Sequence, residues 1–366
     1  MAKARKKAVA VASKARSKVA QVKSRPKPKP KAKTRKIARV AAAKTSARTT
    51  KLPRYDDLPV RAGAPKGAAW GVFGDTDELG TINLMTAECV IKAAAEIRTG
   101  RVFSLNLPLN LPDPPLYGRG VMRHHIFPLP LADFFTDDYL DNFYPQASSQ
   151  WDAVGHIKHP VHGHYNGMPE REVTGRGGGG THLGIENLAR RGIAGRGVLA
   201  DVARFMERRG KIIDCYSGHV ISLKDLEATL AEQKTKIRPG DILLVRVGWV
   251  KSYLASSPEV RAEVAQRPDA PGVEATTDVA RWLWDNHIAA VASDSPAFEA
   301  VNTQAMGEML HPHLLAFFGM PIGEMWDFES LADDCAADKR YSFFLTSAPL
   351  NIPGGVGSPP NALAIK

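Results

Sequence analysis

The stretch Ile288-Ala289-Ala290-Val291-Ala292-Ser293 decides the fold class. It is a short apolar run, typical of a buried strand, and it follows a predicted amphipathic helix at residues 277–286. The polar turn Asp294-Ser295-Pro296 comes directly after it. Ligand groups in α/β proteins often lie at the carboxyl ends of strands, so Asp294 is a candidate substrate contact, although an aspartate here more often caps its own turn.

The same order of elements recurs upstream. Ser222 is placed to cap a helix that runs through Leu230, and Pro239-Gly240-Asp241 then turns the chain into a predicted strand at residues 242–247. Another buried strand is predicted at residues 197–202. This alternation predicts one α/β domain with a mixed sheet and flanking helices.

Residues 108–181 have no clear periodicity and are rich in Pro, Gly and His. A structureless segment of this length in a compact domain usually has a function, so we expect it to build the site. Its stretch Arg176-Gly177-Gly178-Gly179-Gly180 follows no strand, which favours a lid over a phosphate cradle. The chain has no Gly-x-Ser-x-Gly elbow and no Walker loop, so covalent serine hydrolysis and nucleotide chemistry are disfavoured.

Two clusters carry groups that bind metals or transfer protons. Asp152 and His156 lie four residues apart, and His311-Pro312-His313 is followed by Glu324. Carboxylates and imidazoles together can hold a divalent ion or form an acid/base pair. An Asp and a His at this spacing can also be an ordinary hydrogen-bonded pair, and both interpretations stay open on the residues alone.

The amino-terminal segment differs in charge from the rest of the chain. Residues 1–54 hold 20 Lys and Arg and no Asp or Glu, which leaves 29 basic against 38 acidic residues in 55–366, a net charge of −9. The sequence thus predicts a disordered basic arm at 1–54 and a catalytic domain at 55–366. The arm favours nucleic acid or another polyanion as partner. A solvated extension without function is the alternative.

Cysteines and hydropathy narrow the cellular setting. Cys89, Cys215 and Cys335 are far apart and show no Cys-x-x-Cys spacing, so neither a disulfide framework nor a zinc knuckle is indicated. No apolar run approaches the roughly 20 residues of a membrane span. These features predict a cytoplasmic protein.

At these clusters the chain resembles the “Putative cyclase” family, which includes bacterial kynurenine formamidases and isatin hydrolase. The resemblance runs through Trp70-Gly71-Val72-Phe73-Gly74, Gly80-Thr81-Ile82-Asn83-Leu84, Leu183-Gly184-Ile185-Glu186 and Pro353-Gly354-Gly355-Val356-Gly357-Ser358-Pro359. It implies a swivelling β/β/α domain, a divalent metal and assembly as a homo-oligomer.

The family motif is His-x-Gly-Thr-His-x-Asp-x-Pro-x-His. Laid on Asp152, it places its three histidines at Gln146, Gln150 and His156. The resemblance therefore implies Asp152 as a metal ligand and His156 as the base, while two ligand positions hold Gln. Because a Gln amide is a poor zinc ligand, the two substitutions should weaken the site or shift the expected metal from Zn toward Mn or Mg, which prefer oxygen ligands.

The remaining site residues follow from the same resemblance. A later pair completes the family's metal site, here His311, or less closely His313, with Glu324. Trp151 beside the motif could line a pocket for an aromatic substrate or simply pack the loop. His182, in a Gly-Thr-His string without the motif's Asp, is a loop residue or a substrate contact.

The resulting functional hypothesis is a metal-dependent hydrolase of an amide or lactam bond in a small, aromatic carbonyl compound. It resembles an arylformamidase of kynurenine and tryptophan catabolism, with His156 activating a water. The alternative is a non-catalytic ligand-binding or nucleic-acid-associated protein on a cyclase scaffold.

Overall fold

The structure is a computed structural model that describes residues 52–129, 134–173, 182–303 and 309–366. Lys51–Lys366 form one compact unit. The basic arm predicted at residues 1–54 and the Gly-rich stretch at 176–180 lie almost wholly outside the described residues, so both stay predictions. Among the described residues, no helix has the length and apolar character needed to cross a bilayer.

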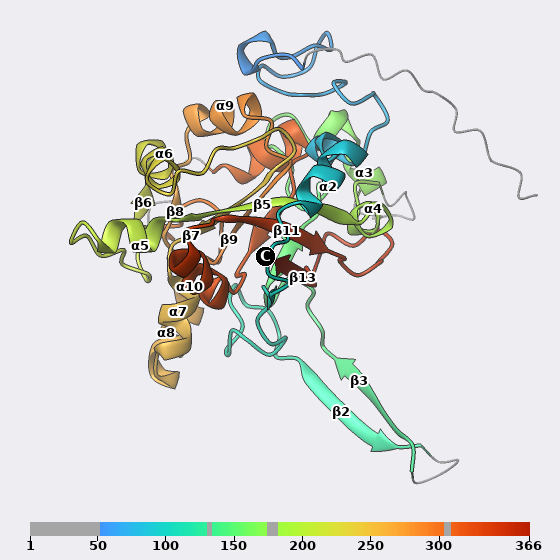
Figure 1. Cartoon of the computed structure of the whole chain (residues 1–366). Coiled ribbons are helices and arrows are strands. Elements are labelled where there is room, and N and C mark those ends of the chain that lie inside the picture. Colours follow the sequence, from blue (N-terminus) through green and yellow to red (C-terminus); the bar gives the residue numbers. More distant parts are fainter. Residues whose placement is uncertain (1–51, 130–133, 174–181, 304–308) are drawn as a thin grey trace, which may run out of the picture. The chain divides into compact units, whose positions relative to one another are not determined.

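A nine-stranded mixed sheet forms the centre of the unit (Figure 1). Its strand order is β1-β13-β11-β5-β7-β9-β10-β4-β12. The bounds are β1 (Val102–Ser104), β4 (Gln150–Asp152), β5 (Ile193–Asp201), β7 (Ile242–Arg246), β9 (Ala290–Ser293), β10 (Ile322–Glu324), β11 (Ser342–Ser347), β12 (Gly357–Ser358) and β13 (Ala362–Ile365). Two pairs lie apart from it, β2 (Arg123–Pro128) with β3 (Thr136–Asp141), and β6 (Val220–Ile221) with β8 (Gly272–Val273).

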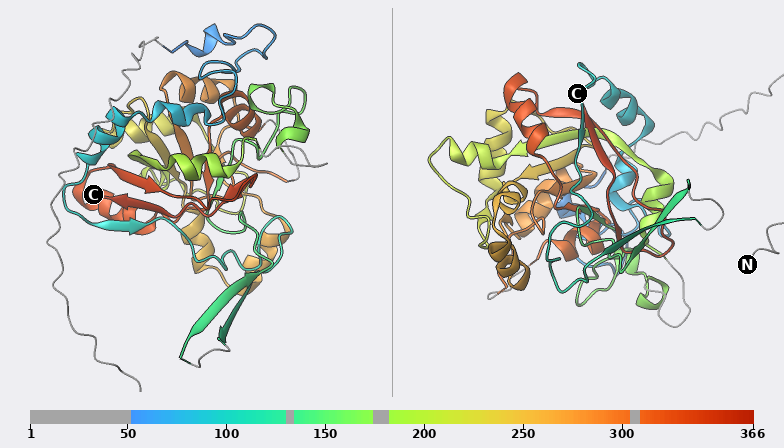
Figure 2. Two further views of the ribbon diagram at one scale, coloured as in Figure 1. Left: turned by 90° about the vertical axis from the view of Figure 1, so that its right-hand side faces the viewer. Right: turned by 90° about the horizontal axis from the view of Figure 1, so that it is seen from below.

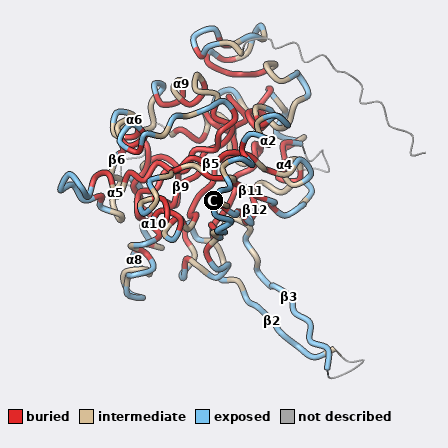
Figure 3. The backbone as a smooth tube through the Cα atoms, viewed as in Figure 1, coloured by how far each residue is buried: buried red, intermediate tan, exposed pale blue. Residues whose placement is uncertain are grey.

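The middle of the sheet is buried on both faces. Strands β5, β7, β9 and β10 run parallel, and successive side chains of β7 enter opposite cores, Leu243 and Val245 one, Ile242 and Leu244 the other. Figure 3 shows these strands as the most buried part of the chain. A strand covered on both faces has to be apolar throughout, which is why the sequence predicts it well.

Helices cover the two faces, as the two further views in Figure 2 let the reader follow. Residues of α6, α7 and α9 pack into one core, and residues of α4 and α10 into the other. The helix bounds are α2 (Ala87–Ala94), α3 (Glu170–Val173), α4 (Ile185–Arg191), α5 (Val202–Glu207), α6 (Leu223–Glu232), α7 (Trp249–Ala255), α8 (Pro258–Gln266), α9 (Thr277–Asp285) and α10 (Glu329–Asp338). Shorter turns are η1 (Tyr55–Asp57), η2 (Gly80–Leu84), η3 (Tyr165–Gly167) and the π-helix η4 (Pro312–Phe318).

These elements confirm the predicted α/β class with a mixed sheet. The Ser222 hydroxyl accepts a hydrogen bond of 3.1 Å from the Asp225 amide, which makes it the cap of α6. The predicted strand at 242–247 and helix at 277–286 each end within one residue of β7 and α9.

Residues 108–181 contain more regular structure than predicted, since β4, η3 and α3 lie within them. They contain the β2–β3 hairpin, whose strands extend away from the body in Figure 1. Its side chains are exposed on both faces, so it lacks the apolar alternation by which a half-buried strand is recognised.

The contact between Gly80 and Gly319 gives a test of the fold. Gly80 has a φ of +54°, and a Cβ there would lie 2.0 Å from the Gly319 carbonyl oxygen. Gly63 has a φ of +79° with nothing within 4 Å. We expect Gly63→Ala to lower the free energy of unfolding by about 1 kcal/mol, the cost of the left-handed backbone alone, and Gly80→Ala by about 3 kcal/mol, because overpacking adds to it. Urea denaturation of both variants measures the difference, and equal losses would contradict the close approach.

Candidate metal centre

Two carboxylates enter the site from adjacent antiparallel strands. In the β4–β10 register, Gln150 pairs with Glu324 and Asp152 with Ile322. Directly opposed residues and residues two apart share one face of a sheet. Gln150, Asp152 and Glu324 therefore project to the same side, and all three are buried.

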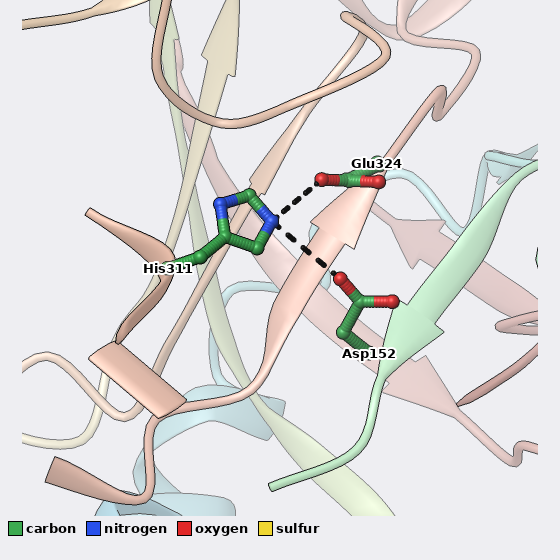
Figure 4. Close-up of side chains that lie close together, drawn as sticks. All are labelled: Asp152, His311 and Glu324. Atoms are coloured by element: carbon green, nitrogen blue, oxygen red, sulfur yellow. Dashed lines mark hydrogen bonds and ion pairs between the residues drawn. The ribbon is translucent and has the colours of Figure 1, made fainter. Parts of the chain in front are cut away.

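His311, at the start of η4, completes the group (Figure 4). Its Nε2 lies 2.9 Å from Glu324 Oε1 and 3.6 Å from Asp152 Oδ2. One ligand atom from each of the three residues lies within 4.8 Å of the other two. The sequence prediction that Asp152, His311 and Glu324 come together agrees with this geometry. His313 instead packs its ring against Phe317, 5.2 Å between centroids.

Glu299 holds the other nitrogen of His311. Its two carboxylate oxygens lie 2.7 and 2.8 Å from His311 Nδ1, and it also accepts a hydrogen bond from the Leu310 amide. A carboxylate at Nδ1 fixes the proton there and turns Nε2 toward Asp152 and Glu324. Metal-binding histidines are commonly oriented in this way.

Two buried oxygens at the cluster have no hydrogen-bond partner among the described residues, Asp152 Oδ2 and Gln150 Oε1. Leaving a buried acceptor unpaired costs about 1–3 kcal/mol, and more for a charged group. A cation between Asp152, His311 and Glu324 would satisfy the free carboxylate oxygen. The donor set and its vacant lone pairs therefore fit a divalent ion.

Gln146 and His156 lie beside Asp152. The Gln146 amide nitrogen is 3.3 Å from Asp152 Oδ1 and 3.0 Å from His156 Nδ1. His156 Nε2 lies 3.8 Å from Asp152 Oδ1, and its side chain is 25% exposed. Gln146 and His156 thus lie beside Asp152, and because both are only partly buried, solvent or a substrate can contact them.

The cluster favours one positive charge among its carboxylates. Burial, and after it the charge of Asp152, raises the pKa of Glu324 to about 7. Burial alone would raise the pKa of Asp152, but the neighbouring imidazoles of His156 and His311 outweigh it and lower that pKa. Burial would lower the pKa of His311, yet the charge of Glu299 and the adjoining carboxylates hold it well above its usual value. Either a protonated His311 or a bound cation can supply that charge.

Each of the three residues predicted to contact substrate makes hydrogen bonds to other residues of the chain. Trp151 is fully buried and donates to Ser347 Oγ at 2.8 Å. Asp294 is fully buried and accepts from the amides of Val247 and Gly248 at 2.7 and 2.8 Å, which joins the ends of β9 and β7. Neither side chain offers surface to a substrate in this geometry.

The third, His182, lies on the surface. Its Nδ1 is 2.8 Å from Glu78 Oε1, and this hydrogen bond raises its pKa. Glu78 also accepts from the Leu183 amide, so the pair fixes the loop before α4. Substrate contact through His182 stays a prediction.

Tyr117 and Arg119 belong to the site and were not found from the sequence. The Tyr117 hydroxyl lies 3.4 Å from the Pro296 carbonyl, and burial, followed by the charge of Glu324, raises its pKa. Arg119 Nη1 is buried without a hydrogen-bond partner among the described residues, and the guanidinium lies 5.2 Å from the centre of the Tyr117 ring. The only sequence signal for Tyr117 and Arg119 was their position within residues 108–181, the segment expected to build the site. Neither residue belongs to a recognisable motif.

Comparison with known proteins defines the class. A sequence model of the family described as “Putative cyclase” matches residues 103–300. A crystal structure described as a novel cyclase is 39% identical and covers 82% of this chain and 99% of its own, with a TM-score of 0.73. The chain therefore belongs to this cyclase family.

The fold also extends to more distant proteins. Isatin hydrolase A from Labrenzia aggregata, solved with benzyl benzoate, is 17% identical with a TM-score of 0.51, covering 72% of this chain and 93% of its own. At this identity the likeness concerns the fold. Among curated protein sequences, no relative matches.

The contact between Glu299 and His311 gives a prediction about metal binding. We expect Glu299→Gln to weaken Mn²⁺ binding about 10- to 100-fold, because the neutral amide holds the His311 ring less firmly. Asp152→Ala should abolish it. Calorimetric titration with Mn²⁺ measures both variants beside Asp137→Asn on the exposed strand β3, which should bind as the wild type does. Unchanged affinity in Glu299→Gln would contradict the orienting role.

Proposed function

We propose that the protein is a metal-dependent hydrolase that cleaves an amide or lactam bond in a small aromatic carbonyl compound. One observation carries the proposal. The buried Asp152, His311 and Glu324 group has a carboxylate oxygen left unpaired, directly beside the partly exposed His156. Isatin hydrolase, with the same fold, supports a cyclic amide as substrate.

Asp152, His311 and Glu324 would hold the ion, and the Gln150 amide nitrogen donates a hydrogen bond to Glu324 Oε2. A divalent ion there polarises a carbonyl and lowers the pKa of a water. Two carboxylates and one imidazole suit Mn²⁺ better than Zn²⁺, which prefers imidazole and thiolate.

His156 is the proposed general base. It accepts a hydrogen bond from the Gln146 amide at Nδ1, so its lone pair lies at that atom. Burial lowers its pKa, which keeps the ring neutral and able to take a proton at neutral pH. A water that displaces the Gln146 amide gives its proton to Nδ1, and its oxygen bonds to the carbonyl carbon. The C–N bond then breaks, and the nitrogen leaves with the proton returned from Nδ1.

Arg119 is the proposed anchor for substrate oxygen. A guanidinium with a buried, unpartnered N–H gains most from a carbonyl or carboxylate that completes its hydrogen bonds. Its charge also reaches the base, because it adds to the burial that lowers the pKa of His156. The substrate therefore carries an acceptor oxygen close to the scissile bond.

A cation-free binding site is the second candidate function. The nitrogen of the Gln146 amide faces Asp152 and His156, so this side chain donates where a metal ligand would offer an oxygen. A protonated His311 between Glu299 and Glu324 would then balance the carboxylates. Absence of Mn²⁺ binding by the wild-type protein favours this function over hydrolysis.

The role of His156 is tested by turnover. We expect His156→Ala to lower kcat about 10²- to 10⁴-fold on isatin or N-formylkynurenine, because the water loses its proton acceptor. His162→Ala, an exposed histidine nearby, should keep wild-type turnover. Full activity in His156→Ala would remove it from the mechanism.

Arg119 predicts a different kinetic signature. Arg119→Gln should raise KM about 10-fold or more, because a hydrogen bond to a charged group contributes about 1.5–3 kcal/mol. The matched variant Arg123→Gln, on exposed β2, should leave KM unchanged. Steady-state kinetics measure KM for both variants. Equal KM values in Arg119→Gln and Arg123→Gln would rule out Arg119 as the substrate anchor.

A further inference from the structure

A basic groove lies beside strand β5. Its volume is about 660 Å³, within the range of small-molecule sites. Of its twelve lining residues, seven are Lys or Arg and one, Glu232, is acidic, so the lining has a net charge of +6. Residues 55–366 as a whole have 29 basic and 38 acidic residues, a net charge of −9. A concentration of positive charge in one hollow of an acidic body indicates a site for an anion.

Arg196, on β5, is the most buried of the basic residues in the groove. Its side chain is 8% exposed, with Nη1 2.7 Å from Asp241 Oδ2 and Nε 3.1 Å from Glu96 Oε1. The same Glu96 oxygen lies 3.1 Å from Arg238 Nη1. Arg208, at another edge of the groove, forms an ion pair with Glu232. The charges of these three arginines are therefore balanced within the protein.

The other four basic residues of the groove keep an unbalanced charge. Lys234 and Lys236 are exposed, and neither forms an ion pair with a carboxylate in the described part of the chain. The side chains of Lys339 and Arg340 donate to backbone carbonyls, at 2.6 and 2.9 Å, which are neutral acceptors. Four cationic groups are thus available to a ligand.

Two of these lysines have a left-handed backbone. Lys234 follows α6 with a φ of +52°, and Lys339 follows α10 with a φ of +61°. Gly or Asn usually takes such a position at a helix end. A cation near the carboxyl end of a helix favours its dipole, which accounts for Lys234 and Lys339. That effect falls off within the last turn and does not extend to Lys236, four residues beyond α6.

We propose that this groove binds a small polyphosphate, a ligand with two or more linked phosphoryl groups. A phosphoryl group carries about −1.5 to −2 charges at neutral pH, so two of them together match the four unbalanced cations. A dicarboxylate would leave about half of that charge unmatched. Lysine, which supplies three of the four cations, binds phosphate as a compact point charge.

The charge of the body favours a ligand that ends within the groove. A strand of nucleic acid would continue past the groove over a body of net negative charge, which repels its phosphates. A diphosphate or triphosphate group is short enough to avoid that repulsion.

The groove is separate from the metal centre. None of its lining residues belongs to the Asp152, His311 and Glu324 group, and β7 and β9 lie between β5 and β10 in the sheet. Polyphosphate binding therefore does not depend on the proposed hydrolase function.

Calorimetric titration of the full chain with tripolyphosphate, without added divalent metal, tests the proposal. The double variant K234Q/K236Q should bind at least about 10-fold more weakly than the wild type, because two charged contacts are lost. The control K66Q/K251Q removes two exposed lysines that do not line the groove, and should bind as the wild type does. Far-UV circular dichroism checks that the variants remain folded.

ATP in a parallel titration identifies the source of the phosphoryl groups. Tighter binding of ATP than of tripolyphosphate, lost in K234Q/K236Q, would support a nucleotide as ligand, and the reverse order would support a free polyphosphate.

Three results would overturn the proposal. One is a wild-type protein that binds neither compound. Another is equal affinity in the wild type, K234Q/K236Q and K66Q/K251Q, which would assign the binding to the basic residues of segment 1–54 instead of the groove. The third is orthophosphate bound as tightly as tripolyphosphate, because the groove would then not need linked phosphoryl groups.

Discussion

The site depends on the burial of Asp152 and Glu324 on neighbouring strands. Two carboxylates away from water and close together are costly unless a positive charge lies between them. His311 Nε2 is directed at that position because Glu299 holds the opposite nitrogen of the ring. The β4–β10 register and the start of η4 together place a buried Asp/His/Glu group that fits a divalent cation where the parallel part of the sheet ends.

Much of the fold could be predicted from the sequence because its central strands are buried on both faces. Residues 242–247 and 288–293 are continuous apolar runs for that reason. The β2–β3 hairpin could not be predicted, since a ribbon exposed on both faces has no core to impose a pattern.

The site also contains residues that the sequence predicts and residues that it does not. Asp152, His311 and Glu324 could be brought together through the family resemblance, although the two carboxylates, at positions 152 and 324, are far apart in the sequence. Glu299 and Arg119 could not, because their roles arise from contacts made only after folding. For Asp294 the sequence left both a substrate contact and a structural cap open, with the cap the commoner case. A polar residue at a strand's carboxyl end is a common ligand position, but here its oxygens accept from the Val247 and Gly248 amides.

Crystals soaked in Mn²⁺ and measured at the manganese absorption edge test the central claim most directly. The account predicts one anomalous peak within coordination distance of Asp152 Oδ2, His311 Nε2 and a Glu324 oxygen. A cluster without a peak, in which His311 bridges Glu299 and Glu324 by hydrogen bonds, would contradict it.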